Sequence, residues 1–209
     1  MEVKEEVQHK SSIDLLKEDI SSIMRYILPK ELKERSNVRI ISVGCGWSPE
    51  ATVLTELLGA QIFLGVDNDY TSLIGARASN LQIESENFVL ADAKDPKTFG
   101  TALWDLIILR NPQVGGSTFK TGYYFEEKID PEWEKILQNC VDYLADNGFI
   151  YLGSATKEEL DKSVIFLQER GLELVVPKKS LIKLDLKSNF PNLENYAAVF
   201  KKPSLPNQK

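Results

Sequence analysis

Two groups of residues in the sequence have the types and spacing of a ligand-binding site. A glycine turn, Gly44-Cys45-Gly46, ends a run of apolar, β-branched residues. Asp67 ends the next apolar run, about twenty residues later, where an acid on a β-α-β unit accepts hydrogen bonds from ribose hydroxyls. Glycine lets a backbone approach a ligand closely, and a carboxylate only accepts hydrogen bonds. The pattern therefore predicts a site for a ligand that contains a ribose.

Parallel strands are needed to bring these residues to one edge of a sheet. Seven apolar runs are expected to be strands, at residues 38–43, 62–66, 87–93, 104–110, 149–152, 172–176 and 196–200. Helical patterns occur at 12–28, from 48, at 70–81, from 131 and at 156–170. The last of these begins with a capping-box pattern, and Asp146-Asn147-Gly148 is expected to end the helix before it. We predict an α/β fold, a doubly wound, mostly parallel sheet of seven strands with helices on both faces.

The start of the helix after the glycine turn separates two classes of ligand. A dinucleotide site is expected to have a third glycine where this chain has Pro49. Ser48 is predicted to cap the helix and Pro49 to occupy its first position. Proline has no N–H to offer a pyrophosphate, and Glu50 adds negative charge at the expected phosphate position. These features disfavour NAD and FAD but suit a cationic ligand without phosphate, such as S-adenosylmethionine.

The region from residue 38 to residue 200 resembles the class I S-adenosylmethionine-dependent methyltransferases. Their first motif is an apolar strand, an acid, an apolar residue and Gly-x-Gly-x-Gly. In this chain Ser42 stands in place of the acid and Ser48 in place of the third glycine, whereas the second motif, GVDND at 65–69, matches well. The resemblance implies an antiparallel last strand between its neighbours. It also implies that S-adenosylmethionine is the cofactor, bound by Gly44, Cys45, Gly46, Asp67, Asn68, Asp92, Ala93 and Arg110.

Within this resemblance, Asp92 would pair with the adenine amino group, and Ala93 would contribute its backbone N–H. A helix cap or turn is the alternative for Asp92. After the fourth strand come Arg110, Asn111 and Pro112, the catalytic lip in the family. Amino-group methyltransferases often carry an Asn-Pro-Pro-aromatic motif here, but this chain keeps only Asn111-Pro112.

We assign Arg110 and Asn111 as catalytic, and Pro112, Tyr123 and Tyr124 as substrate-contacting residues. Two alternatives for Arg110 stay open. Its guanidinium either holds an acidic substrate or pairs with an acid from the next loop. The two tyrosines either line the substrate site or anchor their loop in the core.

Composition limits the other classes of function. The chain has 209 residues, a net charge of −6, one histidine and two cysteines. We therefore expect no metal site, no His-dependent triad and no nucleic-acid partner. No membrane segment or leader is visible, and a cytoplasmic location is expected. One domain is expected at 36–203, after a helical extension at 1–35 that either packs on the domain or covers its cleft, and before a flexible tail at 204–209.

The favoured function is methyl transfer from S-adenosylmethionine to a small molecule. Such a reaction needs no metal, because the sulfonium is a good leaving group and catalysis consists largely of positioning the nucleophile. The alternatives are an RNA or protein N-methyltransferase and a non-catalytic or differently catalytic S-adenosylmethionine-binding protein of the same fold. The sequence does not specify the acceptor atom or the oligomeric state.

Overall fold

The computed structural model describes residues 11–110, 129–154, 156–176, 182–183 and 196–204. Its α-helices are α1 (Ser12–Ile27), α2 (Lys30–Lys33), α3 (Glu50–Leu58), α4 (Tyr70–Ser79), α5 (Pro131–Asp142) and α6 (Lys157–Glu169). Two 3₁₀ turns are η1 (Ser85–Asn87) and η2 (Pro96–Phe99). The strands are β1 (Arg39–Val43), β2 (Ile62–Asp67), β3 (Phe88–Leu90), β4 (Trp104–Arg110), β5 (Leu144–Ser154), β6 (Glu173–Val176), β7 (Ile182–Lys183) and β8 (Tyr196–Lys201).

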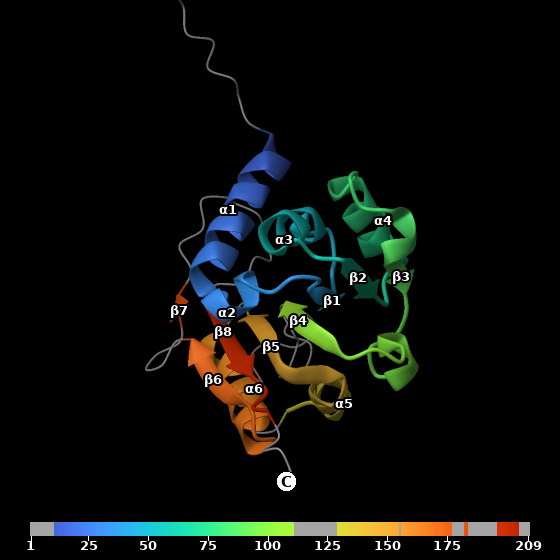
Figure 1. The fold of residues 1–209 in the computed structure, drawn as a ribbon. Coiled ribbons are helices and arrows are strands. Elements are labelled where there is room, and N and C mark those ends of the chain that lie inside the picture. Colours follow the sequence, from blue (N-terminus) through green and yellow to red (C-terminus); the bar gives the residue numbers. More distant parts are fainter. Residues whose placement is uncertain (1–10, 111–128, 155, 177–181, 184–195, 205–209) are drawn as a thin grey trace, which may run out of the picture.

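The strands form one sheet in the order β3-β2-β1-β4-β5-β8-β6 (Figure 1). β1 to β5 are parallel to one another, and β8 runs antiparallel between β5 and β6. The predicted doubly wound sheet with an antiparallel last strand is therefore confirmed. The two-residue strand β7 pairs with β8 outside the seven-strand path and was not anticipated.

Two hydrophobic cores cover the two faces of the sheet. Successive residues of a strand point to opposite faces, and in β1 Ile40 belongs to one core whereas Ile41 belongs to the other. The first core contains side chains of α1, α3 and α4, and the second contains those of α5 and α6. Figure 1 shows the same division of the helices about the sheet. The burial of both strand faces explains the unalternating apolar runs in the sequence.

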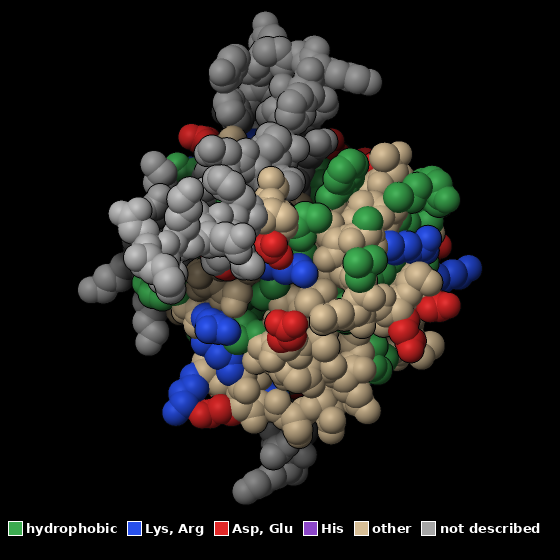
Figure 2. Space-filling model, turned by 90° about the horizontal axis from the view of Figure 1, so that it is seen from above, with side chains coloured by type: hydrophobic (Ala, Val, Ile, Leu, Met, Phe, Trp, Pro, Cys, Tyr) green, Lys and Arg blue, Asp and Glu red, His purple; other side chains and the backbone are tan. Residues whose placement is uncertain are grey.

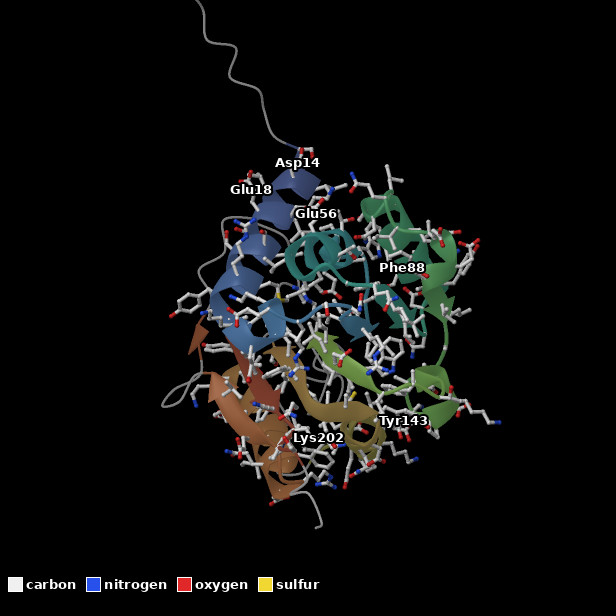
Figure 3. All side chains as sticks on the ribbon, viewed as in Figure 1. Asp14, Glu18, Glu56, Phe88, Tyr143 and Lys202 are labelled. Carbon is white, nitrogen blue, oxygen red and sulfur yellow. The ribbon has the colours of Figure 1, made fainter. Side chains whose placement is uncertain are left out.

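Helix α1 packs into the first core. Ser11 and Asp14 form a reciprocal capping box at its start, and the helix ends before Pro29, close to the predicted bounds. Its apolar stripe, from Leu16 to Ile27, is buried in the same cluster as residues of α3. Figure 3 shows that Asp14 and Glu18 lie at the outer end of this helix layer, away from the sheet. The structure thus shows the packing role, while a cleft-covering role stays a prediction.

Two predicted helix boundaries are wrong. Helix α3 begins at Glu50 with Pro49 as its N-cap residue, and Ser48 does not cap it. Helix α5 ends at Asp142, and the segment from Asp146 to Gly148 lies inside strand β5. There Asn147 adopts φ 57° and its N–H donates to the Lys202 carbonyl at 3.0 Å. Asparagine tolerates this left-handed conformation, so the same residues that often end a helix here form an irregularity in a strand.

Candidate functional site

The carboxyl ends of three neighbouring parallel strands bring the predicted site residues together. β1 pairs with β2 through Val43 and Val66, and β2 pairs with β3 through Asp67 and Leu90. The glycine turn, Asp67 with Asn68, and the segment at Asp92 therefore follow adjacent strands at one edge of the sheet. Ligands of open parallel sheets bind in the crevice at this edge.

The glycine turn has a geometry that only glycine adopts easily. Gly44 has φ 68° and Gly46 has φ 54°. The N–H groups of Gly44 and Cys45 both donate to the Val66 carbonyl, at 2.8 and 3.1 Å. The turn is thus fixed to the end of β2, which places it beside Asp67.

Asp67 is oriented by two backbone amides. The N–H of Gly46 donates to Oδ2 at 2.9 Å, and the N–H of Asp69 donates to Oδ1 at 2.9 Å. The residue is partly exposed, and Asn68 beside it is exposed. A carboxylate oxygen has more than one lone pair, so both oxygens keep capacity for hydroxyl donors. The arrangement is suited to a ribose diol.

Asp92 lies in a turn just after β3, which ends at Leu90 and is shorter than predicted. Its Oδ1 accepts from the Lys94 N–H at 2.9 Å, and its Oδ2 lies 3.4 Å from Lys94 Nζ. The pKa of Lys94 is raised by its hydrogen bond to Glu132 and then by the charge of Asp92. Asp92 therefore acts as a turn residue, which was the alternative to the adenine role. The adenine role stays a prediction for Asp92 and for Ala93, which is buried.

A buried ion pair lies at the end of β4. Arg110 Nε is 2.7 Å from Glu50 Oε2, and the two side chains are only 7% and 1% exposed. The Ser42 hydroxyl donates to Glu50 Oε1, and Arg110 Nη1 donates to the Ser48 hydroxyl at 3.2 Å. Arg110 thus pairs with an acid of α3. The predicted pairing with an acid of the next loop concerns residues 111–128, which lie outside the described part of the chain. The predicted catalytic and cofactor contacts of Arg110 are untested.

Sequence reasoning missed the role of Glu50. It was placed at a helix tip as an obstacle to phosphate, whereas its side chain is buried in the ion pair. One signal in the sequence could have indicated this role. Ser42 stands where the first motif of the resembling family has an acid, so an acid from elsewhere in the chain could be expected beside it. Nothing in the local pattern showed that Glu50 points inward.

Two further features of the turn appear only in the structure. A Cβ added to Gly75 of α4 would lie 2.6 Å from the indole of Trp47, so the ring occupies the space beside that glycine. Cys45 is buried, and burial raises the pKa of its thiol, as do the nearby charges of Glu50 and Asp67. The indole of Trp47 thus packs against α4, and the Cys45 side chain lies in the interior.

Four predicted residues lie outside the described part of the chain. They are Asn111, Pro112, Tyr123 and Tyr124. Among the residues that the structure does describe, no cluster of three or more His, Cys, Asp or Glu side chains could hold a metal ion. In that same part, no helix has the length and apolarity of a membrane span.

Comparison with solved structures identifies the fold. The N-methyltransferase NodS from Bradyrhizobium japonicum has a TM-score of 0.60 over 91% of this chain and 98% of its own, at 15% identity. A TehB-like SAM-dependent methyltransferase from Corynebacterium glutamicum has a TM-score of 0.57 over 88% and 87%, at 20% identity. An rRNA methylase from Streptococcus thermophilus has a TM-score of 0.55 over 95% and 100%, at 14% identity.

The chain has the fold of the S-adenosylmethionine-dependent methyltransferases. Two short motifs carried the resemblance in the sequence. The structural similarity covers the whole methyltransferase fold, including the inserted antiparallel strand. No protein-family model matches the sequence, and neither does any curated protein. At these identities the likeness describes architecture, so activity has to be argued from the site.

Proposed function

We propose that the protein is an enzyme that binds S-adenosylmethionine and transfers its methyl group to a small molecule. The observation that carries the proposal is the contact between Gly46 N–H and the Asp67 carboxylate, 2.9 Å long, at the carboxyl ends of β1 and β2. It joins a close-approach backbone turn to an oriented acceptor for ribose hydroxyls. NodS, one of the structural neighbours, has also been crystallised with S-adenosyl-L-homocysteine.

The residues present fit this cofactor better than a dinucleotide. The turn lacks a third glycine, and Pro49 offers no N–H at the start of α3. The Asp67 carboxylate beside the turn carries negative charge, whereas the charge of Glu50 is paired with Arg110. These features disfavour a pyrophosphate and favour a ligand with positive charge.

In the proposed complex, Gly44, Cys45 and Gly46 surround the amino-acid part of the cofactor. Asp67 and Asn68 receive the ribose. Asp92 and the N–H of Ala93 face the adenine, where the carboxylate accepts from the amino group. The bound cofactor supplies an electrophilic methyl group.

The acceptor side of the proposal rests on the sequence after β4. Asn111 is proposed to accept hydrogen bonds from the nucleophile, and Pro112, Tyr123 and Tyr124 to contact the acceptor. No strong base is required, because orienting the nucleophile in line with the methyl group supplies much of the rate enhancement.

The second candidate is an N-methyltransferase that acts on RNA or protein. The rRNA methylase among the structural neighbours and the Asn111-Pro112 pair favour it. The net charge of −6 disfavours RNA, and acidic and basic side chains are interspersed on the face shown in Figure 2. The chain also lacks the aromatic residue that follows Asn-Pro in the amino-group methyltransferase motif, and small-molecule transfer is therefore preferred.

The test uses methyl-labelled S-adenosylmethionine with three separate acceptor pools. These are a small-molecule metabolite extract, total RNA and total protein, each with an Asp67→Ala variant as the control. The proposal predicts protein-dependent label in the small-molecule pool. Label only in RNA or protein would favour the second candidate. If the protein binds the cofactor but labels none of the pools, a non-catalytic binding protein would be favoured.

A further inference from the structure

The buried pair of Glu50 and Arg110 requires an explanation, because an ion pair is costly to remove from water. Glu50 is 1% exposed and Arg110 is 7% exposed, and their charged atoms lie 2.7 Å apart. Replacement of such a pair by apolar residues is often neutral or stabilising, so burial alone does not account for it. The pair joins the start of α3, just after the glycine turn, to the last residue of β4, and this position points to a functional reason.

The first motif of the resembling family has an acid where this chain has Ser42. In the structure the Ser42 hydroxyl donates to Oε1 of Glu50, so a carboxylate lies directly next to that position. The negative charge is therefore present, but it comes from the start of α3 and not from β1. We propose that Glu50 replaces the missing strand acid and that Glu50 and Arg110 are positioning residues for the cofactor, an inference that rests on the proposed function.

The pair and its hydrogen bonds connect three elements that border the turn. Ser42 belongs to β1, Glu50 begins α3 and Arg110 ends β4. Arg110 also donates to the hydroxyl of Ser48, which stands at the third-glycine position of the motif. The network thus connects the glycine turn to β4, the strand that leads into the predicted catalytic lip. Loss of either charge would change the geometry of the turn and the electrostatic potential at the strand ends together.

The two forms of the cofactor allow these effects to be separated. S-adenosylmethionine carries a sulfonium charge, and S-adenosylhomocysteine does not. Replacement of Glu50 by glutamine leaves the Arg110 charge without this partner, which makes the strand ends more positive. Glu50→Gln should therefore weaken binding of S-adenosylmethionine about tenfold more than binding of S-adenosylhomocysteine, as expected for a nearby unit charge in a protein. A merely structural role would weaken both ligands equally.

The experiment is calorimetric titration of the full chain with each compound, together with thermal melting. The variants are Glu50→Gln and the double variant Ser42→Asp/Glu50→Gln, which returns an acid to the strand. Glu56→Gln is the matched control, because Glu56 is an exposed acid on the same helix (Figure 3). The double variant should recover the preference for S-adenosylmethionine to within about threefold of the native chain, and Glu56→Gln should leave it unchanged.

The inference requires that the native chain binds both compounds. It would be overturned if Glu50→Gln lost affinity for both compounds equally, or if the double variant did not recover the preference for S-adenosylmethionine. Absence of binding of both compounds to the native chain would instead overturn the proposed function. If Glu50→Gln does not fold, the double variant Ser42→Asp/Glu50→Gln provides the second test, because it keeps one acid beside Arg110. It should keep the native preference for S-adenosylmethionine to within about threefold, and a larger loss of this preference would contradict the inference.

Discussion

The N–H of Gly46 donates a 2.9 Å hydrogen bond to Oδ2 of Asp67, a residue 21 positions later in the chain. The contact connects the first and second motifs of the site across the β1–β2 pair. It fixes the turn and the carboxylate relative to each other before any ligand arrives. Both are thus preorganised, which reduces the ordering that binding requires.

Asp67→Ala should weaken S-adenosylhomocysteine binding at least tenfold, on the order of the ~1.5–3 kcal/mol of a hydrogen bond to a charged group. The matched control is Asp69→Ala. Asp69 caps α4 through the N–H groups of Thr71 and Ser72. Its loss should lower the free energy of unfolding, because a helix cap is removed, and leave affinity nearly unchanged. Equal affinity of Asp67→Ala and the native chain, by calorimetry, would remove Asp67 from the site.

The contact of Trp47 with Gly75 predicts a dependence between two substitutions. Alanine is favoured over glycine in a helix by about 1 kcal/mol, but a Cβ at position 75 would lie 2.6 Å from the indole. Gly75→Ala should therefore be neutral or destabilising in the native chain and stabilising in a Trp47→Ala background. Denaturant unfolding of the four chains measures the difference. Additive effects would show that the indole does not occupy this space.

Cys45 should be unreactive in the folded protein. Burial and the charges of Glu50 and Asp67 raise the pKa of its thiol, so the reactive thiolate is scarce at pH 8. Cys140 is also buried, and burial raises the pKa of its thiol too. A thiol reagent such as Ellman's reagent should react with neither cysteine until guanidinium unfolds the chain. Rapid reaction of one equivalent in the native state at pH 8 would show that the turn opens.

Asn111→Ala should reduce turnover far more than cofactor affinity, because the amide is proposed to orient the acceptor. The readout is a kcat measured with the acceptor from the labelling experiment, beside the Kd for S-adenosylhomocysteine. Asn68→Ala provides the contrast, since Asn68 follows β2 on the proposed ribose side. Loss of affinity in Asn111→Ala with an unchanged kcat would assign the residue to the cofactor.

Much of the fold follows from local sequence. The strand from Trp104 to Arg110 was predicted with its exact bounds, because both faces are buried and every residue from Leu106 to Leu109 is apolar. The cap of α6 by Thr156 was also predicted, because a capping box depends on residues three apart. These features depend on neighbours in the chain.

The features that sequence reasoning missed depend on distant partners. Gly148 resembles a helix C-cap, but its carbonyl accepts from the N–H of Lys202, 54 residues later, which draws it into the sheet. Glu50 resembles an exposed first-turn acid, but Arg110 of β4 holds it in the interior. The local sequence pattern shows neither of these distant partners. The ends of the elements and the internal contacts of the site could therefore not be predicted from the sequence.

The central claim is that the strand-end site holds a cationic adenosyl amino acid and not a dinucleotide. The most direct test is calorimetric titration of the native chain with S-adenosylmethionine and, separately, with NAD. The account predicts saturable binding of S-adenosylmethionine with a stoichiometry near one and no heat from NAD. Binding of NAD, or no heat from S-adenosylmethionine at high micromolar concentration, would contradict it.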